Sequence, residues 1–218
     1  MEVPGSEKIT HRSKPDLYLD GEERFGRITS CLYSRFSGMS LWKPYRQIVD
    51  FVKARKPMRL LDVGCGPGDV LLQLAGEIPD ASLWGIDPSA QMVKIAEKRV
   101  AKLGFSGRVT VAEGSSREFD LPGSFDMIIS SFSFHHWSEK RQSLEYLLQR
   151  LTNNGTLAIF DADSDGLYGH IPVIRKHALS KRYAEKLTFT GYDTTIEHSG
   201  DRRLLIVSFR KNNENSDA

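Results

Sequence analysis

The chain has 218 residues, with 39% hydrophobic and 27% charged side chains and a formal net charge of +2. This length suits one well-filled domain, because two halves would each bury too little apolar surface. The composition is that of an ordinary globular protein and excludes a largely disordered or membrane-embedded chain. The near-neutral charge does not favour a nucleic-acid partner, which usually meets a concentrated basic surface.

Both ends of the chain are polar and lack periodicity. The N-terminal segment has no apolar core of a signal peptide, and no apolar run approaches the roughly 20 residues that span a bilayer. We therefore expect a cytoplasmic protein with no membrane insertion, in which Cys31 and Cys65 stay reduced. Residues 1–40 are predicted as an extension and candidate substrate lid, 41–210 as the folded domain and 211–218 as a disordered tail.

Helical and strand-like patterns alternate along the domain. Residues 41–54 are predicted as a helix, with Pro44 in its first turn and an apolar stripe that includes Tyr45. From residue 58, short apolar runs alternate with amphipathic stretches, which is typical of βα units and a mostly parallel sheet. The predicted strands are 59–63, 82–86, 108–112, 125–131 and 156–161.

Two further helices and a hairpin complete the pattern. The helix after the second strand is expected to be capped by Asp87 and stopped by Gly104. Its predicted buried stripe is Met92, Ile95, Ala96, Val100 and Leu103. A helix over 138–151 is expected to end at the Asn154-Gly155 turn, and 192–197 should pair with 204–210 as an antiparallel hairpin.

The most specific motif is LLDVGCGPG at 60–68, an apolar strand that ends in an acid and passes into alternating glycines. Glycines let the backbone approach a ligand closely. A pyrophosphate-binding fingerprint needs a small residue where Asp69 stands, whereas a ligand with ammonium and sulfonium groups suits a nearby Asp62. Asp87 follows the glycines by about 20 residues, the spacing at which an acid accepts hydrogen bonds from ribose hydroxyls.

At this point the chain resembles the class I S-adenosylmethionine-dependent methyltransferases, most closely the group that includes ubiquinone and menaquinone biosynthesis enzymes. The resemblance is carried by four blocks: LLDVGCGPG at 60–68, GIDPSAQM at 85–92, FDMIISSFSFHHW at 125–137, and the stretch 144–161. It implies a single α/β domain with a Rossmann-like, doubly wound sheet of seven strands, mostly parallel with a C-terminal antiparallel hairpin strand. It also implies S-adenosylmethionine as cofactor and S-adenosylhomocysteine as product.

The resemblance further implies which residues bind the cofactor. Gly64, Cys65, Gly66 and Gly68 would line its methionine end, Asp87 the ribose, and Pro88 and Met92 the adenine. The remaining predicted contacts are Asp62, Gly114, Ser115, Ser131, Phe132 and His135. Related enzymes often have an acid after the third strand for the adenine amino group, but this chain has Ser115 in that region.

The predicted reaction is in-line displacement of the sulfonium methyl by a small-molecule acceptor. If the acceptor must lose a proton, His135 is the first candidate base, followed by His136 and Tyr33. Either histidine has an alternative interpretation as a packing residue beside Trp137. The oligomeric state is not indicated by the sequence.

Two other functions stay open. A basic amphipathic helix predicted over 173–187 has a solvated face as its simplest interpretation, but it allows an RNA or protein methyltransferase. The chain is alternatively a non-catalytic S-adenosylmethionine-binding protein. Residues 161–166 imitate the start of a calcium loop, but Pro172 stands where a bidentate Glu is needed, so no metal site is predicted. A metal-assisted, catechol-type methyltransferase is the corresponding variant.

Overall fold

The computed structural model describes residue 17, residues 42–175 and residues 177–212. The strands are β1 (Arg59–Val63), β2 (Ser82–Asp87), β3 (Val109–Glu113), β4 (Phe125–Ser131), β5 (Leu151–Ala162), β6 (Tyr192–His198) and β7 (Leu204–Lys211). The α-helices are α2 (Trp42–Arg55), α3 (Asp69–Glu77), α4 (Ala90–Lys102), α5 (Lys140–Gln149), α6 (Pro172–Arg175) and α7 (Lys181–Ala184). Two 3-10 helices are η1 (Phe134–His136) and η2 (Leu167–His170).

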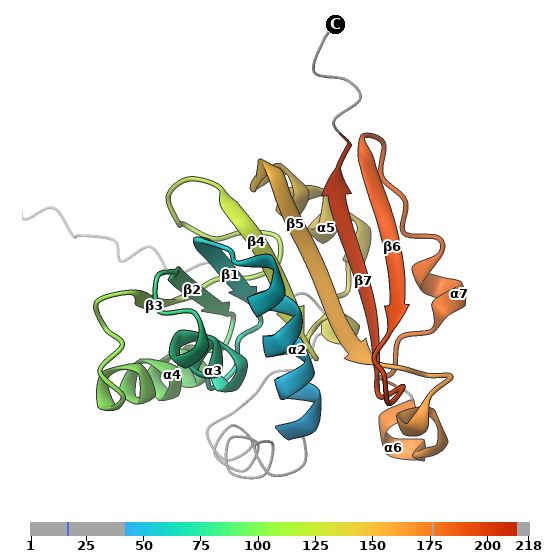
Figure 1. Ribbon diagram of the computed structural model, residues 1–218, viewed down its shortest axis with the longest axis horizontal. Coiled ribbons are helices and arrows are strands. Elements are labelled where there is room, and N and C mark those ends of the chain that lie inside the picture. Colours follow the sequence, from blue (N-terminus) through green and yellow to red (C-terminus); the bar gives the residue numbers. More distant parts are fainter. Residues whose placement is uncertain (1–16, 18–41, 176, 213–218) are drawn as a thin grey trace, which may run out of the picture.

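The strands form one seven-stranded sheet in the order β3-β2-β1-β4-β5-β7-β6 (Figure 1). β1 to β5 pair in parallel, whereas β7 pairs antiparallel with both β5 and β6. The predicted parallel sheet with a C-terminal antiparallel hairpin is therefore confirmed. Parallel strands place their carboxyl ends at one edge of the sheet, where open α/β folds bind ligands.

Helices cover both faces of the sheet, because its central strands are apolar on both sides. α2, α3 and α4 lie over one face and α5 over the other (Figure 1). The predicted stripe of α2 is confirmed, since Tyr45, Ile48, Val49 and Val52 are all buried. This packing makes the sheet a rigid frame for the loops at its carboxyl edge.

The start of α4 differs from the prediction. Its N-cap is Ser89, whose Oγ accepts a hydrogen bond from the Met92 backbone nitrogen at 3.4 Å. Asp87 instead ends β2, and its side chain bonds to the loop. Leu103, predicted in the buried stripe, is 56% exposed, because α4 ends at Lys102 and Leu103 begins the turn to Gly104.

The predicted turn at Asn154-Gly155 is also wrong. α5 ends at Gln149, and β5 begins two residues later, at Leu151, pairing with Phe125 of β4. Gly155 lies within β5 and does not adopt a positive φ. A Cβ there would come within 2.9 Å of the Phe125 carbonyl oxygen, so close strand approach explains this glycine better than a helix end.

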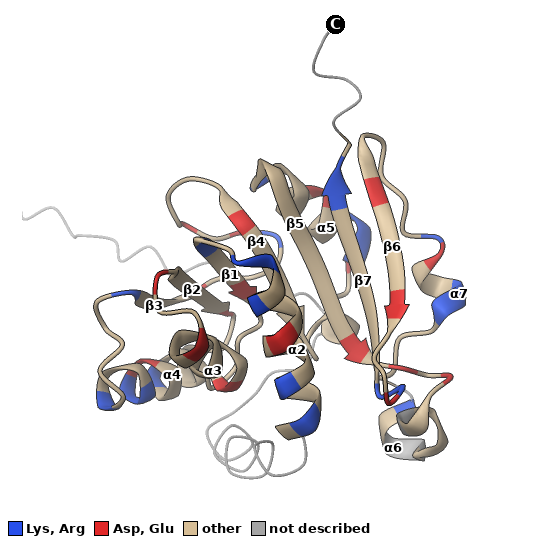
Figure 2. Cartoon of the chain, viewed as in Figure 1, with Lys and Arg blue, Asp and Glu red and all other residues tan. Residues whose placement is uncertain are grey.

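The predicted basic helix over 173–187 is two short helices, α6 and α7. Between them Leu179 forms a bridge with Asp163 beside the end of β5, and Ser180 caps α7. Lys and Arg residues lie on α2, α4, α7 and β7 rather than on one element (Figure 2). The single amphipathic helix on which the RNA or protein alternative depended is therefore absent from the described chain.

The ends of the chain fall mostly outside the described residues, including nearly all of the predicted lid at 1–40. β7 extends through Lys211, and the backbone nitrogen of Asn212 bonds to the Gly191 carbonyl, so the fold continues slightly past the predicted boundary at 210. Among the described helices, none combines the length and the apolar character that crossing a bilayer requires.

Candidate functional site

A pocket lies at the carboxyl edge of the sheet, between the ends of β1, β2 and β4. It encloses about 960 Å³ of space between atoms, which includes open solvent. Its lining consists of Tyr45, Asp62, Val63, Gly64, Cys65, Gly66, Pro67, Asp69, Val70, Asp87, Pro88, Met92, Gly114, Ser115, Ser116, Arg117, Ser131, Phe132, Ser133, His136 and Trp137.

The glycine loop after β1 forms one wall of this pocket. The backbone nitrogens of Gly64 and Cys65 both donate to the Ile86 carbonyl, at 2.8 and 3.0 Å. Gly64 and Gly66 have φ angles of +74° and +54°, a left-handed region that favours glycine. A Cβ on Gly64 would overlap the Ser133 side chain. The loop can therefore adopt this path only with glycine at position 64.

Asp87 ties the loop to the end of β2. Its Oδ2 accepts from the Gly66 nitrogen and its Oδ1 from the Ser89 nitrogen, each at 2.9 Å. Burial raises the pKa of Asp87 to about 6, although these two hydrogen bonds act in the opposite direction. Asp87 therefore holds the loop in place while its carboxylate lines the pocket.

Asp62 is the most unusual group in the pocket. Its side chain is 1% exposed, and its Oδ1 has no hydrogen-bond partner among the described residues. Burial, with a smaller contribution from the nearby Asp87 charge, raises its pKa to about 8. A buried carboxylate without a partner is costly, so the pocket favours a cationic ligand or one that donates hydrogen bonds.

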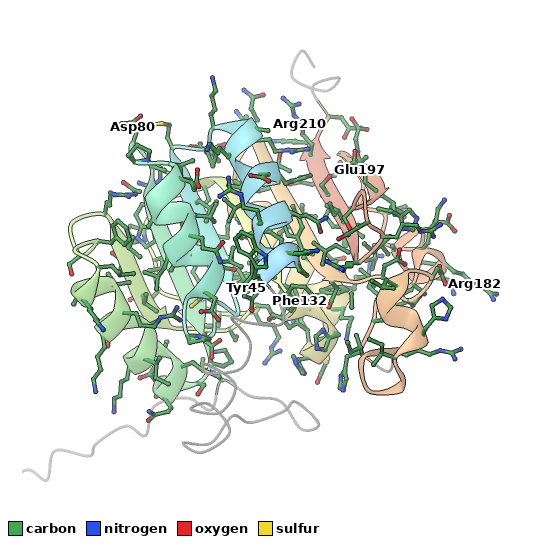
Figure 3. All side chains as sticks on the ribbon, turned by 60° about the horizontal axis from the view of Figure 1, so that its bottom comes forward. Tyr45, Asp80, Phe132, Arg182, Glu197 and Arg210 are labelled. Carbon is green, nitrogen blue, oxygen red and sulfur yellow. The ribbon has the colours of Figure 1, made fainter. Side chains whose placement is uncertain are left out.

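The opposite end of the pocket is aromatic. Phe132 follows β4 with a φ of +52°, and its ring meets the Tyr45 ring edge-on, with centroids 5.9 Å apart (Figure 3). Trp137 donates from its indole nitrogen to Ser133 Oγ at 3.1 Å. His136 lines the pocket beside these rings. This end offers an apolar surface with one imidazole.

His135, the first predicted base, is turned away from the pocket. Its Nδ1 lies 2.9 and 3.0 Å from the two carboxylate oxygens of Asp161, and its backbone nitrogen bonds to the same side chain. Its ring contacts that of His136, with centroids 4.0 Å apart. Of the two adjacent histidines, His136 is therefore the one at the pocket. The third predicted base, Tyr33, lies outside the described residues.

The structure brings most predicted cofactor residues into one pocket. Gly68 and His135 are the two that do not line it; Gly68 instead precedes α3 with a φ of +83°. The pocket residues that were not among the predicted site residues are Tyr45, Val63, Pro67, Asp69, Val70, Ser116, Arg117, Ser133 and Trp137. Ser116 and Arg117 directly follow the predicted Gly114-Ser115 contact, so extending that loop was the available indication.

The acidic residues that imitate a calcium loop have protein partners. Asp161 bonds to His135, and Asp163 Oδ2 lies 2.7 Å from His198 Nδ1. Both carboxylates are fully buried. Asp161 and Asp163 therefore hold histidine side chains next to the loops that follow β5.

The strand order, the glycine loop and the acid at the end of β2 are the features that the sequence motifs led us to expect of a class I methyltransferase fold. Residues 60–155 match the family described as "Methyltransferase domain". This match, together with the relatives and solved structures below, supports the predicted resemblance to class I S-adenosylmethionine-dependent methyltransferases of the small-molecule type.

Three comparisons illustrate this similarity. A trans-aconitate 2-methyltransferase of Rhodococcus jostii is 29% identical over 172 residues, 76% of this chain and 62% of that protein. A demethylmenaquinone methyltransferase of Thermotoga maritima is 30% identical over 116 residues, 53% of this chain and 48% of that protein. The chain thus spans about half to three fifths of these curated relatives. The plantazolicin methyltransferase BpumL, solved with S-adenosylhomocysteine, shares the fold with a TM-score of 0.69 and 18% identity, covering 85% of this chain and 90% of its own.

Proposed function

We propose that the protein transfers a methyl group from S-adenosylmethionine to a small-molecule acceptor bound at the aromatic end of the pocket. The strongest support is the buried side chain of Asp62 beside the glycine loop, because its Oδ1 has no hydrogen-bond partner among the described residues. Relatives are named for methylating trans-aconitate and demethylmenaquinone, which are both small molecules.

The residues of the pocket fit the chemical groups of the cofactor. Asp62 Oδ1 and Ser131 Oγ are buried atoms without a hydrogen-bond partner in the described chain, and both residues line the pocket. An ammonium or hydroxyl group of the ligand would satisfy them. The pocket also carries Asp69 and Asp87, so its acids disfavour a phosphate-bearing ligand and favour a cationic one.

When bound, the cofactor supplies a methyl group activated by its sulfonium. The chain's own residues then have three tasks. The glycine loop allows close backbone approach at the methionine end, and Asp87 accepts hydrogen bonds from the ribose. Phe132, Tyr45 and Trp137 hold the acceptor and exclude water from the transfer. His136 replaces His135 as the imidazole placed to contact the acceptor.

Calorimetric titration with S-adenosylmethionine and S-adenosylhomocysteine tests the cofactor assignment. Wild-type protein is expected to bind both at micromolar concentration, and Asp87→Ala should weaken binding by about 1–3 kcal/mol. Asp80→Ala is the matched control, because Asp80 is an exposed acid that precedes β2, whereas Phe132 follows β4 and lies well apart from it (Figure 3). Absence of binding by wild-type protein would contradict the proposal.

Methyl transfer is tested separately by mass spectrometry, with carboxylate and quinol acceptors as probes. A mass gain of one methyl group on an acceptor, lost in His136→Ala, supports the proposed acceptor end. Transfer that His136→Ala leaves unchanged removes this residue from the proposal but keeps the cofactor site. The cytoplasmic location is also part of the proposal, and cell fractionation tests it.

A further inference from the structure

Three histidines from separate parts of the chain meet beside the pocket. We propose that His135, His136 and His177 bind one divalent transition-metal ion of the Zn²⁺ class. Each offers one ring nitrogen, and these three nitrogens lie within 4.8 Å of one another. The sequence predicted no metal site, because Pro172 stands where a calcium loop needs a bidentate Glu. His177 lies about forty residues from the other two histidines in the sequence.

The geometry requires only small movements to hold an ion. The ring centroids of His177 lie 5.2 Å from those of His135 and 5.9 Å from those of His136. Zinc binds imidazole nitrogen at 2.0–2.1 Å, which in a tetrahedral site separates ligand nitrogens by about 3.3 Å. The three rings are tilted by 45–57° to one another rather than stacked, so side-chain rotation can bring their nitrogens together.

Asp161 prepares His135 for this role. Both of its carboxylate oxygens face His135 Nδ1, which therefore carries the proton and donates it. The lone pair of the ring is then on Nε2, available to a metal. A carboxylate behind a histidine is the usual arrangement around zinc, where it fixes the ring and strengthens the ligand. Asp161 is fully buried, so it holds the ring rigidly.

The three histidines lie in segments that follow β4 and β5. η1 supplies His135 and His136 at the carboxyl end of β4, whereas His177 comes from the segment between α6 and α7 that follows β5. All three side chains are partly exposed, so an ion can enter from solvent. Three protein ligands leave a fourth position open, as in catalytic rather than structural zinc sites.

Because His136 also lines the pocket, the open position lies on the acceptor side. This part of the inference rests on the proposed function: the ion would bind an acceptor oxygen, nitrogen or sulfur and favour its deprotonated form. With the ion bound, His136 acts on the acceptor through the metal rather than as a free base.

The site is tested by titrating the full chain, freed of metal with a chelator, with Co²⁺ and then displacing the Co²⁺ with Zn²⁺. One ion per chain is expected, with the visible absorption of Co²⁺ bound by nitrogen ligands in a four-coordinate site. His177→Gln should weaken binding at least about tenfold, and Asp161→Asn should weaken it by about 10–100-fold. His170→Gln is the matched control, since His170 is an exposed histidine of η2 outside the cluster.

Each outcome decides the proposal. Loss of the Co²⁺ spectrum in His177→Gln but not in His170→Gln supports the site. No stoichiometric binding, or equal binding by His177→Gln and wild type, overturns it. Thermal unfolding without metal shows whether each variant is folded. His177→Gln should bind S-adenosylhomocysteine like wild type, so failure of the metal site and failure of the cofactor site are distinguishable.

Discussion

Aspartates lie at or near strand ends in two parts of the sheet, but their hydrogen-bond partners differ. Acidic residues lie at the lower ends of β1 and β5 (Figure 2). Asp62 and Asp87 are buried with raised pKa values. Asp62 Oδ1 has no hydrogen-bond partner among the described residues, and Asp87 accepts from two backbone nitrogens. Asp161 and Asp163 are equally buried, yet each bonds to a histidine ring.

We call the part of the sheet with Asp62 and Asp87, at the ends of β1 and β2, the binding half. The part with Asp161 and Asp163, at the end of β5, is the supported half. A buried carboxylate is stabilised by a partner, and where the protein provides none, a ligand is the natural partner. The acids of the binding half therefore favour a cationic ligand, as proposed above. The β5 half uses its acids to fix imidazoles, and through His135 it supports the proposed metal site.

The largest expected effect is in the binding half. Gly64→Ala places a Cβ against the Ser133 side chain at a φ of +74°. We expect a loss of cofactor affinity or of unfolding free energy on the order of 3–4 kcal/mol. Isothermal titration and urea denaturation measure the two. Gly107→Ala, where a Cβ meets open space, is the control, and an equal effect there would refute the steric explanation.

Asp62→Asn should change the pH dependence of stability. The folded pKa of about 8 lies above the ordinary 3.8, so the folded protein keeps a proton that the unfolded chain releases between these values. The free energy of unfolding therefore falls as pH rises from about 4 to about 8. The ligand-free variant should match wild type near pH 4 and exceed its stability by on the order of 2–3 kcal/mol near pH 8.

Urea denaturation across this pH range checks the prediction, with Asp80→Asn as an exposed control. The same substitution should weaken S-adenosylmethionine binding, because a neutral amide attracts an ammonium group less strongly than a carboxylate does. A variant that is no more stable than wild type at pH 8 would mean that Asp62 has a partner, and the contrast between the two halves would fail.

In the supported half, the expected change in the free energy of unfolding is smaller than that of Asp62→Asn and is a loss rather than a gain. His198→Ala removes the ring that bonds Asp163 Oδ2 at 2.7 Å. The buried carboxylate then keeps the Asp165 backbone nitrogen, 2.9 Å from Oδ1, and the more distant Arg202 Nε, 3.9 Å from Oδ2. We expect a loss of about 1–2 kcal/mol of unfolding free energy. Chemical denaturation measures it, and His170→Ala should cost little. A neutral His198→Ala would show that Asp163 does not depend on this histidine.

The smallest contrast concerns helix caps. Ser89 caps α4 in the binding half and is buried, whereas Ser180 caps the single turn of α7. Ser89→Ala should cost about 1 kcal/mol and Ser180→Ala roughly half of that. Thermal denaturation of both variants tests the order. A larger loss for Ser180→Ala would mean that α7 contributes more to stability than its length suggests.

Local patterns in the sequence predicted the sheet and most of the pocket. The ranges of β1 and β4 are as predicted, because each is a short apolar run with clear ends. Asn154-Gly155 misled the prediction, because turn-forming residues also occur where two strands approach closely. The pocket orientation of His136 and the nearness of His177 depend on tertiary packing, which no local pattern contains.

The placement of β7 has a consequence for biosynthesis. β7 lies between β5 and β6, although it follows both in the chain, and it pairs with β5 over seven residues. On the ribosome, the apolar edge of β5 and the whole of β6 therefore wait for β7 to emerge before the sheet can close. A nascent chain stopped before Leu204 would expose that edge, and we expect it to require a chaperone or to aggregate.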